Sequence, residues 1–266
     1  MKDTAQKEQA LPEGLEFLKL IWYQEGRCED ETDRQIPDMG IKAPQCLTNL
    51  GTVLSLLDRA ASCFWGCPGS DHTIEYLTGR VYSSARASLR LIRFGFYDES
   101  LSITRSIGEI ANLLFLFFND RSAFNQWKGS TKRERMNNFS PARVRLALDA
   151  LGVPLPMEAN RYSELCEIAT HVTPETKPQA HNLAGRPVLG GYFQEGGVLV
   201  SLNELAAAVS IATFASSKLM SLEDEIRKRI GSESLKLLRS VGAVDVIQMP
   251  QWWEKLRNNS DASSSP

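Results

Sequence analysis

Residues 98–118 run DESLSITRSIGEIANLLFLFF, and this stretch decides the fold. On a helical wheel its apolar side chains cover nearly the whole circumference, and it ends in the apolar run Leu113–Phe118. A helix that is apolar on all sides has to be surrounded by other elements. The stretch therefore predicts a central, buried helix in a bundle.

One polar stripe interrupts this helix. Arg105, Glu109 and Asn112 are four and three residues apart, so they share a face, with Gly108 beside them. Buried charges are costly unless they are paired. Two interpretations stay open: Arg105 and Glu109 pair and fix the register of the bundle, or the stripe faces a polar pocket.

Helical periodicity and capping residues recur through the rest of the chain. The acidic, proline-containing stretch 25–44 is expected to be a loop, and the capping box Ser201–Glu204 is expected to open the longest helix. The expected helices span approximately residues 15–22, 47–57, 71–94, 98–118, 141–151, 160–172, 201–219, 221–231 and 234–241.

The main exception is the segment 174–200, which holds three prolines and five glycines. Its residues 187–193 and 198–200 could pair as a small hairpin around Gln194–Gly197. A loop this long inside a helical domain is often functional.

These patterns predict an all-α multi-helix bundle with a long Gly/Pro-rich loop, holding a possible small hairpin, before the longest helix. We expect an N-terminal helix and acidic loop extension in residues 1–45, a bundle domain in residues 46–257 and a disordered Ser/Asn-rich tail in residues 258–266.

Composition is that of a soluble globular protein: 266 residues, 42% hydrophobic, 23% charged and a net charge of −2. No apolar run approaches the roughly 20 residues of a membrane span. Five cysteines without regular spacing are typical of reduced thiols. We therefore expect a cytoplasmic protein with no membrane partner.

Charge is unevenly distributed along the chain. Residues 76–145 carry 12 lysines and arginines against 5 aspartates and glutamates, whereas residues 1–75 carry 7 against 13. Basic side chains near aromatic and amide groups suit a phosphate-rich, single-stranded partner. The candidate nucleic-acid-binding residues are Arg86, Arg90, Arg93, Lys132, Arg133 and Arg135. The alternatives are a solvated face balanced by the acidic N-terminal third, or a surface that meets an acidic surface of another subunit.

His171 is the second candidate for chemistry. It shares a helical face with Glu164 and Glu167, and it ends its helix where the Gly/Pro-rich segment begins. The simpler interpretation is an ordinary solvated Glu–His pair.

A metal site has less support. Cys63, Cys67 and His72 offer three ligands and Cys46 a distant fourth, but structural zinc favours a second closely spaced pair. Phosphate-binding, dinucleotide-binding, nucleophile-elbow and zinc-protease motifs are absent from the sequence. We predict no metal and no cofactor.

Two segments carry a family resemblance. Residues 85–109, ARASLRLIRFGFYDESLSITRSIGE, contain a helix pair joined by a Gly-containing turn and an Arg-Ser-x-x-Glu core, and residues 162–171 run YSELCEIATH. They resemble uncharacterised bacterial helical bundles that are similar to the HEPN (higher-eukaryote and prokaryote nucleotide-binding) superfamily. The resemblance covers roughly 35 residues. Active members of that superfamily are metal-independent ribonucleases or nucleotide-binding proteins of toxin and antiphage systems.

The chain departs from the superfamily's Arg-x(4–6)-His pattern, because nine residues separate Arg161 from His171. A catalytic set would consist of Arg105, Glu109 and His171 brought together in space, with His171 as general acid/base and Arg105 stabilising phosphate charge. We therefore predict a protein that binds RNA or a nucleotide in a bacterial stress or antiphage context, and we leave open whether it cleaves RNA. The alternative is a non-enzymatic helical adaptor or homo-oligomeric interaction protein.

Overall fold

The computed structural model describes residues 14–40, 42–66, 69, 71–153, 155–172 and 189–241. All regular secondary structure in these residues is helical, which confirms the all-α bundle. The helices are α1 (Gly14–Gln35), the short 3-10 helix η1 (Ile36–Asp38), α2 (Lys42–Ala61), α3 (Thr73–Arg93), α4 (Tyr97–Asn119), α5 (Arg121–Gly129), α6 (Lys132–Asn138), α7 (Pro141–Ala150), α8 (Ala159–Ala169), α9 (Glu195–Leu219) and α10 (Asp224–Ser240).

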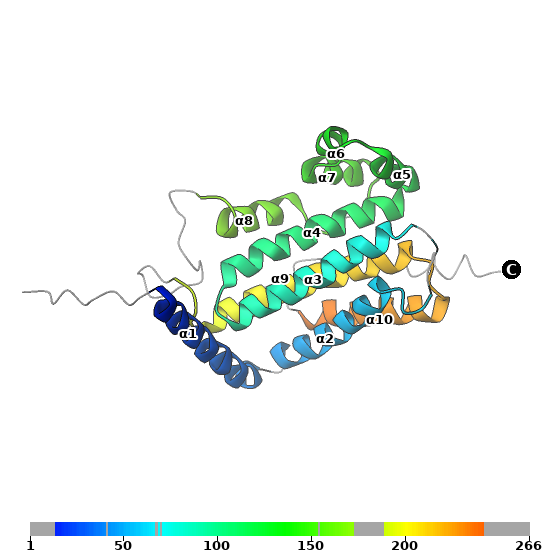
Figure 1. Ribbon diagram of the computed structural model, residues 1–266. Helices are drawn as coiled ribbons and strands as arrows, with labels where there is room; N and C mark the ends of the chain where they lie inside the picture. The colour runs from blue at the N-terminus through cyan, green and yellow to red at the C-terminus, as the bar shows by residue number, and fades with distance from the viewer. Residues whose placement is uncertain are drawn as a thin grey trace, which may run out of the picture.

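The centre of the bundle is the pair α4 and α9, with α3 alongside both (Figure 1). α2 and α10 cover one side of this pair, and α8 and α5–α7 lie along α4 on the other side. Tyr97 and Phe117 of α4 and Leu205 of α9 are fully buried. The small residues Ala206 and Ala212 are also fully buried, so neighbouring helices can approach α9 closely. The prediction of a central residue 98–118 helix is confirmed.

The predicted loop over residues 25–44 is wrong. α1 continues through this acidic stretch to Gln35, and α2 begins at Lys42. The carboxylates that argued for a loop are held by arginines of α3, so their charge is compensated in the helix. Pro37 lies in η1 and Pro44 in the first turn of α2, where a missing N–H costs no helical hydrogen bond.

The predicted hairpin and capping box are wrong as well. α9 begins at Glu195, so residues 198–200 are helical and Ser201 is a buried residue inside the helix. Gly197 serves close packing instead of a turn, because a Cβ there would lie 2.5 Å from the ring of Tyr97. The rest of the predicted hairpin falls partly outside the described residues.

Four smaller differences concern helix ends and number. The two short helices expected after residue 221 form one helix, α10. The helix expected to reach residue 172 ends at Ala169. α5 and α6 were not predicted: Asp120 caps α5 by accepting the N–H groups of Ser122 and Ala123, and Thr131 and Glu134 form a capping box on α6. The expected bundle start at residue 46 lies within α2, and the expected tail 258–266 lies outside the described residues.

Two helices of the described chain, α4 and α9, are long and apolar enough to cross a membrane. However, 56% and 67% of their most apolar windows are buried within the bundle. The core helices of a soluble protein have the same length and composition, so this is weak evidence for a membrane protein.

Candidate functional site

The polar stripe of α4 forms an ion pair. The Nη1 atom of Arg105 lies 3.1 Å from Oε1 of Glu109, and the two side chains are only 17% and 28% exposed. The same Nη1 atom donates a hydrogen bond to the Tyr162 hydroxyl at 2.8 Å and lies 3.5 Å from Sγ of Cys166. The stripe therefore lies at the interface of α4 and α8.

A second arginine joins this group from α7. The guanidinium carbon of Arg145 lies 4.4 Å from the ring centroid of Tyr162, and that of Arg105 lies 5.2 Å from the same centroid. Both are cation–π distances. We call Arg105, Glu109, Arg145, Tyr162 and Cys166 the Tyr162 cluster. It draws on three helices, α4, α7 and α8.

The Tyr162 cluster has donors that no described residue accepts. Nε of Arg105 and Nη1 of Arg145 are buried, and neither has a hydrogen-bond partner among the described residues. Buried N–H groups are nearly always paired, and an unpaired one costs free energy. With two guanidiniums against one carboxylate, the Tyr162 cluster also carries an excess positive charge.

Burial and charge act in opposite directions on Arg105. Desolvation lowers the pKa of its guanidinium, but the nearby Glu109 carboxylate, Cys166 and Tyr162 outweigh this effect and raise the pKa overall. Burial, followed by the Glu109 charge, raises the pKa of Tyr162. Arg105 is therefore a permanent cation, and the Tyr162 hydroxyl keeps its proton at neutral pH.

Asn112 and Gly108 place α8 against α4. The Asn112 side chain donates to the carbonyl of Met157 at 3.0 Å and accepts its N–H at 2.8 Å. A Cβ at position 108 would come within 2.2 Å of the Met157 side chain. The third member of the polar stripe thus fixes the segment before α8, which carries Tyr162.

His171 lies at the other end of α8. Its backbone N–H donates to the carbonyl of Cys166 at 2.7 Å, and its side chain is exposed. The preceding Thr170 faces Ser102 across an Oγ1–Oγ distance of 3.4 Å. The contacts of Arg105 on α8 are with Tyr162 and Cys166, so the structure brings together two members of the predicted catalytic set, Arg105 and Glu109, and places the exposed His171 beyond them.

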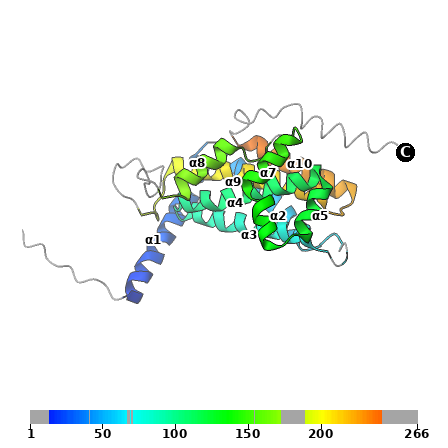
Figure 2. The ribbon, with the colours of Figure 1, turned by 90° about the horizontal axis from the view of Figure 1, so that it is seen from above.

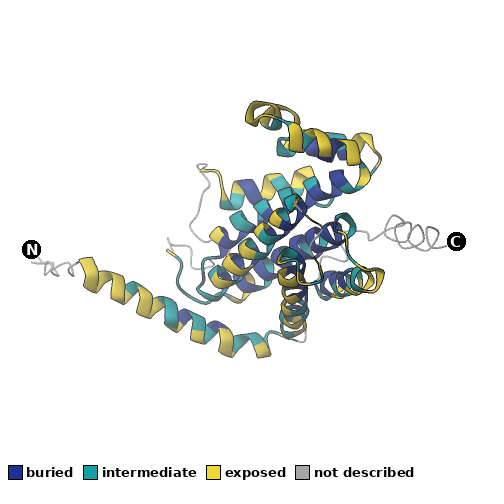
Figure 3. Cartoon of the chain, turned by 45° about the vertical axis from the view of Figure 1, so that its right-hand side comes forward, coloured by how far each residue is buried: buried dark blue, intermediate teal, exposed yellow. Residues whose placement is uncertain are grey.

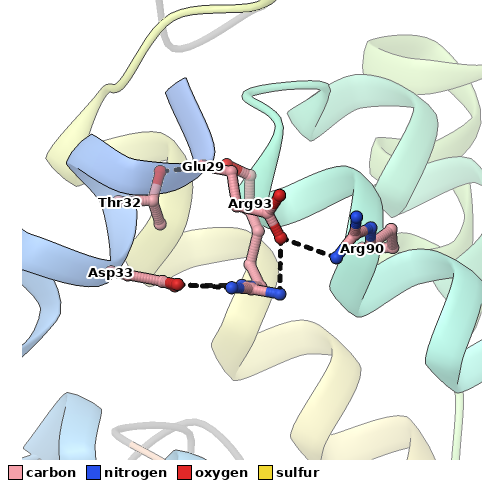
Figure 4. A network of polar contacts seen from close by, with 5 residues as sticks. All are labelled: Glu29, Thr32, Asp33, Arg90 and Arg93. Carbon is pink, nitrogen blue, oxygen red and sulfur yellow. Dashed lines mark hydrogen bonds and ion pairs between the residues drawn. The ribbon is translucent and has the colours of Figure 1, made fainter. Parts of the chain in front are cut away.

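Two of the candidate nucleic-acid-binding residues are engaged with α1 (Figure 4). Arg93 pairs with Glu29 at 2.7 Å and with Asp33 through two nitrogens, and Arg90 pairs with Glu29 at 2.6 Å. The Thr32 hydroxyl donates to the backbone carbonyl of Arg93. For Arg90 and Arg93, the positive charge of the middle of the chain is therefore balanced by the acidic N-terminal third.

The other basic candidates are less engaged. Arg86 is exposed and stacks on Tyr82, with 5.3 Å between its guanidinium carbon and the ring centroid. Lys132 and Arg133 are exposed on α6 and make no ion pair with the described residues. Arg135 is partly buried, and its guanidinium donates to the Ser130 carbonyl.

Together with the exposed Arg143 of α7, Lys132 and Arg133 form what we call the α6–α7 basic surface. These helices belong to the group α5–α7 at one corner of the molecule (Figure 1). Arg143 and Arg145 belong to the same helix, but residues two apart on a helix point in nearly opposite directions, so this surface and the Tyr162 cluster lie on different faces of α7.

The cysteines do not assemble a metal site within the described residues, which hold no group of three or more His, Cys, Asp or Glu side chains placed for a metal ion. Sγ of Cys63 lies 3.5 Å from Nδ1 of His72. Cys46 is buried in α2, where burial raises the pKa of its thiol to about 11. Cys67 lies outside the described residues.

A separate groove of about 430 Å³ lies on α2 and α10, between Thr48, Ser55, Arg59 and Arg229. None of the predicted site residues lines it. The candidate site is therefore the Tyr162 cluster.

Sequence reasoning missed three members of this site. Tyr162 and Cys166 entered the sequence analysis only within the segment 162–171 that carries the family resemblance, and Arg145 only as one of the basic residues counted between 76 and 145. The only available signal was the four-residue spacing of Tyr162 and Cys166, which puts them on one face of α8. In comparisons with known proteins, no protein-family model, no curated protein and no solved structure matched the chain.

Proposed function

We propose that the protein binds phosphate groups of RNA or of a nucleotide, as its resemblance to HEPN-like bundles implies. The observation that carries the proposal is the Tyr162 cluster, where Nε of Arg105 and Nη1 of Arg145 are buried and find no acceptor in the part of the chain that the structure describes. Phosphate oxygens are strong acceptors for guanidinium N–H groups and would neutralise the excess positive charge.

The α6–α7 basic surface offers a second place for phosphate groups. Lys132, Arg133 and Arg143 are exposed cations without carboxylate partners among the described residues, so they can contact further phosphates along a strand. Arg90 and Arg93 are left out of the proposal because they already pair with α1.

Ribonuclease activity is a separate hypothesis. It requires the exposed His171 to act on RNA held at Arg105, with His171 as general acid/base. Cleavage of bound RNA that disappears in His171→Ala, while binding persists, is the expected outcome if this hypothesis holds. Cleavage that survives in His171→Ala would contradict it. The cytoplasmic location and the stress or antiphage context rest on composition and on the resemblance.

The direct test is the affinity for a labelled single-stranded RNA and for a labelled nucleotide at low and at moderate salt. If phosphate contacts dominate, the affinity for RNA falls steeply with added salt. Arg145→Gln should weaken binding about tenfold and reduce the salt dependence by roughly one phosphate contact. The matched control is Arg239→Gln, an exposed arginine of α10 outside the site, which should bind as the wild type does.

Circular dichroism separates a binding defect from unfolding, because Arg145 also stacks on Tyr162. The combined change Lys132→Gln, Arg133→Gln and Arg143→Gln should weaken RNA binding more than nucleotide binding, since only a strand reaches the whole α6–α7 basic surface. Equal affinity in all variants, or no binding at low salt, would contradict the proposal.

A different observation favours the alternative function of an adaptor or homo-oligomer. The N-terminal half of α1 exposes a dense group of large apolar side chains. Such a surface is typical of protein–protein contacts and does not depend on phosphate binding.

A further inference from the structure

The first eleven residues of α1, 14–24, extend away from the bundle (Figure 2). We call this segment the α1 arm. Its large apolar side chains are exposed, which is visible in the predominance of exposed residues along α1 in Figure 3. Trp22 is 58% exposed and Tyr23 is 63% exposed. The exposed set consists of Leu15, Phe17, Leu18, Leu20, Trp22 and Tyr23.

These side chains surround the helix instead of forming one stripe. Successive residues of an α-helix are rotated by about 100°, so positions 15, 17, 18, 20, 22 and 23 point in all directions. A helix that is apolar all round is normally buried. In the described structure the α1 arm has no such cover, so it is a surface that another molecule would bury.

The other half of α1 is anchored on its own bundle. Cys28 and Thr32 are buried, and Glu29 and Asp33 pair with arginines of α3 (Figure 4). The base of the α1 arm is therefore attached to α3, which reduces the entropy cost of binding the arm.

Charge narrows the choice of partner. The α1 arm carries only Glu16 and Lys19, which pair with each other at 2.7 Å, so the arm has no net charge. The next stretch, 25–35, carries five acidic and two basic residues. Helices that bind anionic membrane surfaces are rich in lysine and arginine, whereas the α1 arm has a single lysine and no arginine. A neutral apolar arm instead suits an identical arm, which brings no charge repulsion.

The area of one face of the α1 arm suits a weak dimer. Because the apolar side chains surround the helix, two packed arms bury only the sides that face each other, on the order of 300 Å² per copy when a whole aromatic side chain counts as about 150–250 Å². Two copies would bury about 600 Å², which is the size of a weak, concentration-dependent contact.

We propose that the α1 arm packs against the α1 arm of a second copy of this chain, forming a homodimer about a two-fold axis. The two arms run antiparallel, because this places the two acidic stretches 25–35 at opposite ends of the contact and keeps them apart. The interface is isologous, so each arm buries the same residues. This dimer is independent of phosphate binding.

The test is the molecular mass of the full chain by sedimentation equilibrium over a wide range of concentrations. The wild type should reach the mass of two chains. The double variant Leu18→Glu and Trp22→Glu should remain a single chain, because it buries two charges in the interface. The matched control is Tyr76→Glu, which changes an aromatic residue of α3 that is 74% exposed, and it should dimerise as the wild type does.

A second variant tests whether loss of the dimer in the double variant results from misfolding. Trp22→Ala removes the largest side chain of the α1 arm without adding charge and should raise the dimer dissociation constant about tenfold or more. Hydrogen exchange should show protection of residues 15–23 that depends on protein concentration.

Three outcomes would overturn the proposal. The first is a wild type that stays monomeric at all concentrations, whether or not it binds lipid vesicles or another protein. The others are a dimer that persists in the Leu18→Glu and Trp22→Glu variant, and a dimer that is lost equally in Tyr76→Glu.

Discussion

Gly197 of α9 packs directly against the ring of Tyr97 of α4. A Cβ at position 197 would lie 2.5 Å from Cδ2 of Tyr97, well inside van der Waals contact. The Tyr97 ring cannot easily move, because it is fully buried and its hydroxyl accepts the N–H of Gln194 at 2.9 Å. Burial also raises the pKa of Tyr97 well above its ordinary value, so the hydroxyl remains protonated. A single glycine thus sets the distance between α9 and α4.

Gly197→Ala should therefore destabilise the protein, whereas Gly196→Ala should not. The added methyl at position 197 overpacks a rigid core and should cost about 1–3 kcal/mol in the free energy of unfolding. At position 196 a Cβ meets nothing within 4 Å, so the change should be neutral or stabilise by up to about 1 kcal/mol. Urea unfolding of both variants measures the difference. Similar stabilities for the two would contradict the close contact.

At the scale of elements, the docking of α1 on α3 depends on charge more than on apolar contact. In α1 only Cys28 and Thr32 are buried, while Arg93 pairs with both Glu29 and Asp33 (Figure 4). Ion pairs of this exposure are individually weak and are screened by salt. The attachment of α1 should therefore be sensitive to ionic strength.

Arg93→Ala should loosen α1 without unfolding the bundle. The lost pairs should cost about 1 kcal/mol of stability, less at high salt, and amide hydrogens of residues 28–35 should exchange faster. Arg86→Ala is the matched control, because Arg86 lies on the same helix, is exposed and pairs with no carboxylate among the described residues. Unchanged exchange in Arg93→Ala would show that apolar contacts alone hold α1.

At the scale of the whole molecule, burial is concentrated in two helices. α4 and α9 contain about half of the buried residues of the described chain and pack on each other more extensively than any other pair of helices, whereas α6 has no buried residue at all. Local opening requires little free energy where few apolar contacts are broken. Stability should consequently fall from the centre of the bundle towards α6.

Native-state hydrogen exchange should follow this order. Amides in the middle of α4 and α9 should exchange only on global unfolding, while those of α6 should exchange through local opening at a much lower free energy. As the urea concentration rises, the hydrogen-exchange rates of amides in α4 and α9 should converge, whereas the exchange rates of amides in α6 should change little. Exchange of α6 as slow as that of α9 would contradict this distribution of stability.

The sequence by itself determined the helical class and the central helix, because both follow from local periodicity. Residues 98–118 are apolar all round, and this pattern holds whatever the neighbours are. The four-residue spacing of Arg105 and Glu109 likewise placed both charges on one face of a helix, and the structure then showed that they pair. The Asp120 cap is equally local, since it bonds to Ser122 and Ala123, but the sequence analysis did not predict it.

Only the tertiary structure decided which residues far apart in the sequence contact each other. The acidic stretch 25–35 is helical because Arg90 and Arg93, some 60 residues away, compensate its charge. Gly197 lies within a helix because it faces the Tyr97 ring, although glycine in a sequence favours a turn. Arg145 belongs to the candidate site because α7 and α8 both pack on α4 and bring it to Tyr162. These contacts join residues far apart in the sequence, and they contribute free energy only once the helices are assembled. Patterns among neighbouring residues therefore cannot predict them.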